Sequence, residues 1–445
     1  MDKTSAFPSR INIKPVGRPL AGGLAVPGGK SMANRAILLA GAAHGESRLG
    51  RLPDSADVRA AISVLAELGV PARREGGVLV LPGRGLAFPN QSGEIHLGAS
   101  GTVGRFLPGL LAAAPAGAWR LVSSPQLAAR PLQPLLDALR QWGAGLEPAM
   151  PNRSFPLEVR GGGLSGGTVV VSAAASSQFA SGVLLAAPLC RRPARVVIRN
   201  LDPEETYIDM TLELMRRFGV EARAAPDGSD LVVLVDAPAS YRAAAVEMEA
   251  DANTAAYFLA LAALTGSRIA VINLDPASRQ PGTRFLGVLS RLGCAITASP
   301  AGVTAVGGPL PLRGGFSLDM RAMAELAVTL GVLAVFADQP IRLTNLAHIR
   351  GHESDRLSAL SALLGQAGVV TEEAPDGITV HPARPGGIRR IVVDPRDDHR
   401  LAMSFALLGA AANGIGIENS GCVAKTCPGF FRMLAELGVG VDPVL

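Results

Sequence analysis

The sequence predicts an α/β (α+β) fold of six βαβαββ repeats, three in each of two domains. Three observations support this prediction. An amphipathic helix that ends in glycine recurs along the whole chain, a second and wholly apolar helix recurs at the same period, and β-branched segments lie between them. A repeat at a fixed period of this length indicates one supersecondary unit that is copied along the chain.

The first family of helices is amphipathic, and each member runs into a glycine and then a hydrophobic strand. DVRAAISVLAELGV and YIDMTLELMRRFGV are two of the six copies. The intervals between the terminal glycines are 74, 76, 74, 75 and 70 residues. These glycines are Gly69, Gly143, Gly219, Gly293, Gly368 and Gly438.

The second family is rich in alanine and apolar on nearly every side, as in SMANRAILLAGAA and HRLAMSFALLGAAANG. A helix without a polar face has to be buried. We therefore expect one inner and one outer helix in each repeat. The inner helices are predicted to begin near Ser31, Thr102, Ser177, Asn253, Glu325 and His399.

Segments such as GGTVVVSA, SRIAVINL and IRRIVVD are β-branched and bounded by Gly, Pro or Asp, which is typical of strands. Six repeats of about 75 residues exceed the usual size of a single core. Three repeats in each domain are the natural division of the chain.

Composition excludes several classes of protein. The 445 residues carry a net charge of +5 without a long basic run or interleaved aromatics, which argues against a nucleic-acid groove. The four cysteines show no metal-ligand spacing, so we expect reduced thiols, a cytoplasmic protein and no metal. No apolar run reaches the roughly 18 residues of a membrane span, and the first residues do not resemble a secretory signal.

The predicted inner helices begin with charged or hydroxyl residues although they are apolar along their length. Helix N-termini attract phosphate or carboxylate, so parallel inner helices would gather such groups at one cleft. The simpler interpretation is that Ser31, Thr102 and Ser177 are ordinary N-caps. The polar residues at these starts and in the loops before the outer helices are Lys30, Ser31, Arg35, Gly101, Thr102, Arg105, Arg130, Ser176, Ser177, Gln178, Glu325, His352, Glu353, Arg356, Asp398, His399, Arg400 and Lys425.

Eight segments, in order, resemble the EPSP synthase family of enolpyruvyl transferases. They are PGGKSMANRAILLA, LGASGTVGRF, RPLQPLLDAL, SSQFASGVLL, YIDMTLELMRRFGV, HESDRLSAL, DDHRLAMSFALLG and AKTCPGFF. GHESDR, with His where many members have Lys, resembles the actinobacterial branch.

The resemblance implies a two-domain inside-out α/β barrel with buried parallel helices. One domain would span residues 28–247, the other residues 1–27 plus 248–445, and the cleft between them would be the active site. The implied reaction transfers the enolpyruvyl group of phosphoenolpyruvate to the 5-hydroxyl of shikimate 3-phosphate. The family uses no metal or organic cofactor and is typically monomeric.

Site residues are carried over by position in the matching segments. Catalysis is assigned to Lys30, Glu325 and Glu353, with the acid and the base left open. Phosphoenolpyruvate is assigned to Lys30, Gly101, Arg130, Gln178, Arg356, Arg400 and Lys425. Shikimate 3-phosphate is assigned to Lys30, Ser31, Arg35, Ser176, Ser177, Gln178, Tyr207, Glu325, His348 and His352.

Some positions depart from the family pattern. Glu325 replaces the commoner Asp, His348 stands where others have Asn, and Glu204 falls where many members have a Ser that touches the substrate phosphate. A carboxylate beside a phosphate is repulsive unless a cation intervenes. Gly101 leaves room for the inhibitor glyphosate, while Phe106 replaces a common Pro.

Three alternatives remain open beside this interpretation. A related enzyme with a different acceptor alcohol is favoured by Glu204, and an inactive binding homologue is disfavoured by the retained charged residues. The sister transferase that acts on UDP-N-acetylglucosamine carries a reactive Cys in the second repeat. The corresponding stretch here, AWRLVSSPQLAARPL, contains none.

Overall fold

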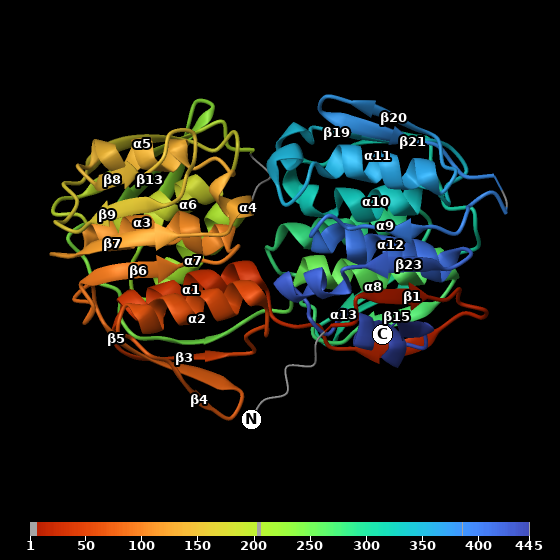
Figure 1. The fold of residues 1–445 in the computed structure, drawn as a ribbon, viewed down its shortest axis with the longest axis horizontal. Helices are drawn as coiled ribbons and strands as arrows, with labels where there is room; N and C mark the ends of the chain where they lie inside the picture. The colour runs from red at the N-terminus through yellow and green to blue at the C-terminus, as the bar shows by residue number, and fades with distance from the viewer. Residues whose placement is uncertain (1–6, 203–205, 385, 445) are drawn as a thin grey trace. The chain divides into compact units, whose positions relative to one another are not determined.

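The computed structural model describes residues 7–202, 206–384 and 386–444. The chain divides into two compact units, unit 1 with Met1–Pro27 and Glu249–Leu445 and unit 2 with Gly28–Met248. Each unit contains three four-stranded sheets in the described residues. The α/β class and the repeated organisation predicted from the sequence are confirmed (Figure 1).

Unit 2 holds the sheets β14-β3-β5-β4, β6-β7-β9-β8 and β10-β11-β13-β12. Their strands are β3 (His44–Gly50), β4 (Arg73–Glu75), β5 (Val78–Arg84), β6 (Ser92–His96), β7 (Ala118–Val122), β8 (Gly145–Pro148), β9 (Leu157–Arg160), β10 (Gly167–Ser172), β11 (Ala194–Arg199), β12 (Ala222–Asp227), β13 (Asp230–Val235) and β14 (Ala245–Glu247).

Unit 1 holds the sheets β22-β23-β1-β24, β16-β17-β15-β2 and β18-β19-β21-β20. Their strands are β1 (Arg10–Ile13), β2 (Ala21–Leu24), β15 (Arg268–Val271), β16 (Ala295–Ser299), β17 (Gly302–Val306), β18 (Phe316–Asp319), β19 (Ile341–Thr344), β20 (Thr371–Ala374), β21 (Gly377–Val380), β22 (Val392–Val393), β23 (Ile415–Glu418) and β24 (Val441–Val444).

Every sheet has the same topology, with one parallel pair of strands extended by two antiparallel strands. In the parallel pairs, β18 lies beside β19 with Asp319 opposite Thr344, and β10 lies beside β11 with Ser172 opposite Arg199. A parallel connection requires a crossover, and a buried helix makes it. The loops after the two parallel strands therefore leave the sheet at the same edge.

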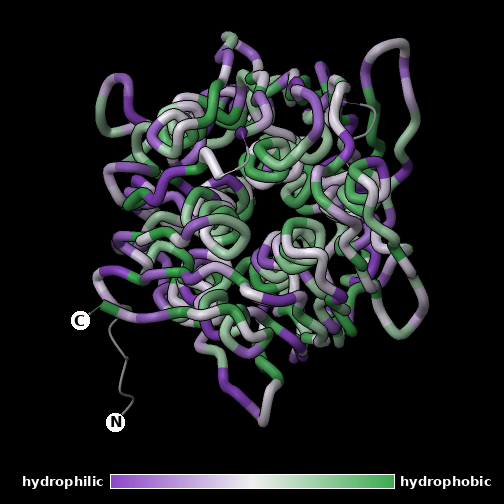
Figure 2. The backbone as a smooth tube through the Cα atoms, turned by 90° about the vertical axis from the view of Figure 1, so that its right-hand side faces the viewer, coloured by the Kyte–Doolittle hydropathy of each residue, from purple (hydrophilic) through white to green (hydrophobic). Residues whose placement is uncertain are grey.

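The inner helices are buried on all sides, as predicted. In Figure 2 the helices seen end-on in the interior are mostly green, while purple segments lie mostly on outer loops. The fifth helix differs from expectation, because Glu325 lies in a 3₁₀ segment, η3 (Arg321–Leu326), before the α-helix begins. The inner helices are α1 (Lys30–Ala42), α3 (Gly101–Ala113), α6 (Gln178–Ala186), α8 (Ala252–Thr265), α10 (Ala327–Ala334) and α12 (His399–Ala411).

The outer helices end at the predicted glycines, all six of which have positive φ between 81° and 106°. That conformation favours glycine and stops a helix. These helices are α2 (Ala56–Glu67), α5 (Gln133–Gln141), α7 (Tyr207–Arg217), α9 (Phe285–Arg291), α11 (Arg356–Gln366) and α13 (Phe430–Glu436). Short helical segments are α4 (Pro125–Ala128), η1 (Ala187–Leu189), η2 (Pro281–Arg284), η4 (Ala347–Gly351) and η5 (Ser420–Lys425).

Each unit has its own apolar core, built from small and aliphatic side chains. Among the described residues, no helix combines the length and apolar character that crossing a membrane requires. The same residues contain no cluster of three or more His, Cys, Asp or Glu side chains arranged to hold a metal ion. All four cysteines are free thiols.

Candidate active site

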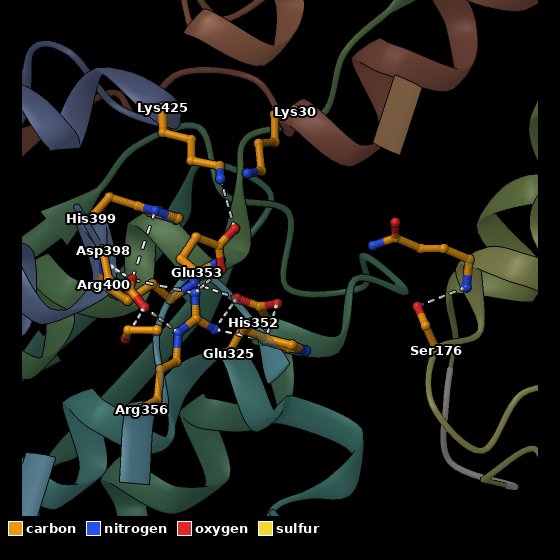
Figure 3. A network of polar contacts seen from close by, with 12 residues as sticks. Lys30, Ser176, Glu325, His352, Glu353, Arg356, Asp398, His399, Arg400 and Lys425 are labelled. Atoms are coloured by element: carbon orange, nitrogen blue, oxygen red, sulfur yellow. Dashed lines mark hydrogen bonds and ion pairs between the residues drawn. The ribbon is translucent and has the colours of Figure 1, made fainter. Parts of the chain in front are cut away.

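Arg356 is the centre of a polar cluster in unit 1 (Figure 3). It is the first residue of α11, its side chain is 1% exposed, and the side chain of the N-cap residue Asp355 accepts a hydrogen bond from the backbone N–H of Ser358. Its guanidinium donates to Asp398 Oδ2 at 2.8 Å, to Glu353 Oε2 at 2.7 Å and to Glu325 Oε2 at 3.1 Å. Three carboxylates from three different loops thus meet on one buried cation.

Arg400 lies in the first turn of α12, where Asp398 is the N-cap and accepts from the Arg400 backbone N–H at 2.9 Å. The Arg400 guanidinium forms an ion pair with Glu325 and donates to the Tyr257 hydroxyl of α8 at 3.1 Å. Asp398 therefore serves twice, because it caps α12 and also holds Arg356. Two arginines share Glu325 as a partner.

Lys425, at the end of η5, extends the cluster. Its Nζ lies 2.9 Å from Glu353 Oε1, while the other oxygen of Glu353 accepts from Arg356. His352 places Nδ1 3.1 Å from Arg356 Nη1, and the His348 ring packs edge-on against the His352 ring. All the unit 1 residues predicted from the sequence are thus brought together, and a buried carboxylate, Asp398, joins them.

The electrostatics of the cluster favour charged forms. Burial would raise the pKa of Glu325, but the charges of Arg400, Arg356 and His352 outweigh it and hold that pKa well below its ordinary value. Burial would lower the pKa of Arg356, but the charges of Asp398, Glu325 and Glu353 raise it. Burial lowers the pKa of His348, which favours the neutral imidazole at neutral pH. Glu325 is therefore an ionised carboxylate in this state.

The named charges of the cluster balance. Arg356, Arg400 and Lys425 face Glu325, Glu353 and Asp398. An anionic ligand of this cluster has to compete with carboxylates that already occupy the cations. Such a competition would release a carboxylate for proton transfer at the moment of binding.

Unit 2 presents a different set of cations. Lys30, the first residue of α1, forms an ion pair with Asp57 of α2 at 3.1 Å. The Asp57 side chain is 5% exposed and that of Lys30 is 16% exposed. Asp57 therefore fixes the position of the Lys30 ammonium while leaving it partly accessible.

Gly101 begins α3 beside two arginines. A Cβ added at Gly101 would lie 3.2 Å from Arg130 Nη1 and 3.8 Å from Arg105 Nη1. Arg105 in turn donates to Gln178 Oε1 at 2.8 Å, and the Gln178 backbone N–H donates to Ser176 Oγ at 3.3 Å. The predicted residues Gly101, Arg130, Gln178 and Ser176 thus lie along one connected patch.

Arg35 is buried in unit 2, and its assignment to shikimate 3-phosphate stays a prediction. Its side chain is 1% exposed, and it donates to Thr211 Oγ1 at 2.8 Å, to Ser181 Oγ at 3.1 Å and to the Ser31 carbonyl at 2.9 Å. The guanidinium also lies over the rings of Phe106 and Tyr207. Arg35 ties α1 to α6 and α7.

The N-cap interpretation of the hydroxyl residues is wrong for two of the three. The N-caps of α1 and α3 are Gly29 and Ser100, so Ser31 and Thr102 lie inside their helices. Ser177 is the N-cap of α6, but its side chain makes no capping bond. None of these three helices has an acidic residue in its first turn. Uncapped helix starts beside cations suit an anion.

Sequence reasoning gave no role to Asp57 or Tyr257, and it named Asp398 only as one of the polar residues at the inner-helix starts. Asp57 and Tyr257 lie inside periodic helical segments and resemble ordinary helix residues in the sequence. Asp398 directly precedes His399 and Arg400, so its N-cap role could have been inferred from the pattern. Glu204, the position that departs from the family pattern, lies outside the described residues.

Comparisons with known proteins agree on one family. The model of the family described as EPSP synthase (3-phosphoshikimate 1-carboxyvinyltransferase) matches residues 15–434. The chain is 37% identical over 431 residues to 3-phosphoshikimate 1-carboxyvinyltransferase 2 of Halalkalibacterium halodurans, covering 97% of this chain and 95% of that one. It is 38% identical over 422 residues to 3-phosphoshikimate 1-carboxyvinyltransferase of Syntrophobacter fumaroxidans, covering 93% and 96%.

Solved structures share the fold. An EPSP synthase from Acinetobacter baumannii has a TM-score of 0.78 at 22% identity, over 97% of this chain and 99% of that one. The enolpyruvyl transferase NikO from Streptomyces tendae has a TM-score of 0.74 at 17% identity, over 97% and 98%.

Proposed function

Because the chain belongs to the EPSP synthase family, we propose that it transfers the enolpyruvyl group of phosphoenolpyruvate to the 5-hydroxyl of shikimate 3-phosphate. The observation that carries the proposal is the buried cluster of Arg356, Arg400 and Lys425 held by three carboxylates. A trianionic three-carbon donor needs such cations, and its reaction needs nearby proton carriers.

The proposed donor site uses Arg356, Arg400 and Lys425 of unit 1 and Lys30, Gly101, Arg130 and Gln178 of unit 2. Arginine suits a bidentate grip on carboxylate or phosphate, while the Lys30 and Lys425 ammonium groups act as point charges. Glycine at position 101 keeps Arg130 unobstructed, since a Cβ there would crowd its guanidinium.

Shikimate 3-phosphate is proposed to bind Lys30, Ser31, Ser176, Ser177, Gln178 and Tyr207, together with Glu325, His348 and His352. The uncapped starts of α1 and α6 and the absence of acidic residues in their first turns support a phosphate here. Arg35 belongs to the same proposed set, and its bond to the Ser31 carbonyl and its position over the Tyr207 ring also orient two of those residues.

The reaction adds the acceptor oxygen to C2 of the donor and a proton to C3, and then expels phosphate and one proton. We propose Glu325, the acidic residue that the resemblance places near the hydroxyl, as the acceptor of the hydroxyl proton, since its carboxylate is ionised. Glu353 is assigned to proton delivery at C3, with help from Lys30. Donor anions that take over Arg356 and Lys425 would favour the protonated form of Glu353.

The remaining proposals concern the oligomeric state, the cellular location and the partners of the protein. We propose a monomer in the cytoplasm, with the two substrates as its partners. Its four free thiols support a reducing compartment, and burial raises the pKa of Cys190, Cys422 and Cys427 to about 12, which keeps them unreactive.

The test is release of phosphate from purified protein mixed with both substrates. Release is expected without added metal and in the presence of a chelator. Lys30→Ala and Arg400→Ala should abolish turnover while circular dichroism shows that the fold stays intact. Lys14→Ala is the matched control, because Lys14 pairs with Asp442 at the surface with 62% of its side chain exposed.

Glu204 keeps open a second class of acceptor substrate, an alcohol other than shikimate 3-phosphate. A carboxylate at this position in the sequence would repel a substrate phosphate if the phosphate bound near it. Release of phosphate with another alcohol, and none with shikimate 3-phosphate, would replace the proposed acceptor. A fully active Lys30→Ala protein would contradict the assigned site.

A further inference from the structure

Three asparagines occupy the same place in three sheets. Asn200, Asn345 and Asn419 directly follow β11, β19 and β23, the second strand of each parallel pair. Their φ angles are 54°, 61° and 45°, in the left-handed region. We call them the strand-end asparagines.

Each strand-end asparagine donates its side-chain amide to the partner strand or to the loop after it. Asn200 Nδ2 donates to Ser172 Oγ at 3.3 Å, and Asn345 Nδ2 donates to Asp319 Oδ2 at 2.8 Å. Asn419 Nδ2 donates to Asp397 Oδ1. Two chain segments that leave the sheet side by side are thereby joined by a side-chain bond beyond the last backbone pair.

The joined segments carry the residues of the proposed active site. Asp319 leads to Glu325, and Asn345 begins the loop that holds the two histidines, Glu353 and Arg356. Asp397 is followed at once by Asp398, His399 and Arg400, while Asn419 leads to Lys425. Ser172 leads to Ser176 and Gln178, and Asn200 begins the segment that leads to Tyr207.

Asparagine suits this place for two reasons. It is among the few residues other than glycine that tolerate the left-handed conformation, and its amide supplies a donor that glycine lacks. The side-chain bond is most needed at Asn419. Its acceptor Asp397 and the preceding residue Arg396 also have positive φ, at 57° and 51°. Consecutive residues in this conformation persist only where the surroundings hold them.

We propose that the strand-end asparagines are positioning residues, each locking two loops of one sheet so that the charged groups on them stay in register for the reaction. The proposal rests on the proposed function for its kinetic consequence. Asn419 is the sharpest case, since its bond lies one residue from Asp398, which binds both Arg356 and the start of α12.

The test compares Asn419→Gly with Asn152→Gly. Glycine keeps the left-handed backbone and removes only the amide. Asn152 has the same conformation, with φ 59°, on an exposed turn between β8 and β9, so its replacement controls for the loss of an asparagine side chain. We expect kcat to fall by roughly tenfold to a hundredfold in Asn419→Gly, because small misplacements of reacting groups have effects of this size. Asn152→Gly should match the wild type.

A reciprocal exchange tests the bond itself. Asn419→Asp alone sets two carboxylates against each other and should lower kcat at least as much as Asn419→Gly. Adding Asp397→Asn restores an amide–carboxylate pair with reversed polarity, so the double variant should recover most of the loss. Recovery of this kind is not expected if Asn419 only contributes to general stability.

Hydrogen exchange gives a readout that needs no substrate. The backbone amides of residues 396–402 should exchange about tenfold faster in Asn419→Gly than in the wild type, with the rest of the chain unchanged. Unchanged exchange together with kcat within twofold of the wild type would overturn the proposal, and so would a double variant no better than Asn419→Asp. If the wild type fails to release phosphate, the proposed function fails, while the exchange comparison still decides whether Asn419 holds the loop.

Discussion

Gly101 shows how a single missing side chain shapes the proposed donor site. A methyl group at this position would lie 3.2 Å from Arg130 Nη1, closer than side-chain carbons normally approach a neighbour. Gly101→Ala should therefore displace the Arg130 guanidinium and raise KM for phosphoenolpyruvate by about tenfold, equivalent to about 1.4 kcal/mol of binding. Steady-state kinetics at saturating shikimate 3-phosphate measure this change.

Gly287→Ala is the matched control for that substitution. Gly287 lies in helix α9, and an added Cβ there meets nothing within 4 Å. Its replacement should leave KM unchanged and stabilise the helix by roughly 0.5–1 kcal/mol. An unaltered KM in Gly101→Ala would remove the steric argument for glycine at position 101.

Glu325 gives the protein a predicted dependence of stability on pH. Burial disfavours its charge, but Arg400, Arg356 and His352 hold its pKa well below the ordinary value in the folded protein. A depressed folded pKa contributes stability above the unfolded value of about 4.3, and the contribution is lost as pH falls toward the folded pKa. Glu325→Gln should therefore be less stable than the wild type at pH 7, with the difference shrinking below about pH 4.

Denaturant unfolding of both proteins between pH 7 and pH 3 measures this difference. Glu372→Gln serves as the control, because the Glu372 side chain is 68% exposed and pairs with His381 near the surface. A difference between Glu325→Gln and the wild type that stays constant over the whole range would show that the Glu325 charge is not stabilised as described.

At the scale of elements, the start of α12 depends on one buried carboxylate. Asp398 is fully buried, caps α12 and binds Arg356, whose side chain is 1% exposed. Asp398→Ala removes that cap and one of the three carboxylates around the buried Arg356 charge, so it should lower the free energy of unfolding by about 3–5 kcal/mol. Equilibrium unfolding in urea gives the value.

Asp442→Ala is the control, because it removes an exposed carboxylate instead of a buried one. Asp442 pairs with Lys14 at 2.6 Å, but both side chains are more than half exposed. Its loss should cost about 0–1 kcal/mol. Equal effects of the two substitutions would contradict the view that burial makes the Arg356 pair important.

Periodicity predicted the type of most elements. Apolar repetition identified the inner helices, and glycines such as Gly69 marked the ends of the outer ones because only the left-handed conformation fits there. The start of the fifth inner helix was less predictable, since Glu325 carries no signal that separates a 3₁₀ turn from an α-helix. Local patterns also could not reveal that Ser31 lies inside α1, because Gly29 takes the N-cap position.

At the scale of the whole molecule, local sequence patterns could not predict which distant segments pair as strands. Ala245–Glu247 forms a parallel pair with Arg48–Gly50, and Ala21–Leu24 pairs with Arg268–Val271. These pairs complete one sheet in each unit from strands about 200 or more residues apart in the sequence. The repeated polar helix starts indicated that the charged groups around Arg356 gather at one place, but the pairs among them depend on the tertiary fold, and their substrate roles came only from the family resemblance.

The proposed substrate residues of unit 2 lie beside uncapped helix starts, whereas those of unit 1 lie in a cluster of paired charges, and this difference predicts how the ligands bind. In unit 2, Lys30, Arg105 and Arg130 lie near uncapped helix starts, and Asp57 is paired with Lys30. In unit 1, the carboxylates of Glu325, Glu353 and Asp398 already compensate the cations. Because uncapped helix starts favour an anion, an anion alone should bind the residues of unit 2 more readily than those of unit 1.

Thermal unfolding with each substrate alone tests this expectation. Shikimate 3-phosphate at a hundredfold excess over its Kd should stabilise the protein by about 2.7 kcal/mol, and the same concentration of phosphoenolpyruvate should stabilise it less. Added salt should reduce the effect of shikimate 3-phosphate, because screening weakens a partly exposed phosphate site. Shikimate without the phosphate controls for contacts to the ring. A larger shift with phosphoenolpyruvate alone would show that this anion displaces the carboxylates of unit 1 from their cations without bound shikimate 3-phosphate. The proposed balance of charges would then be wrong.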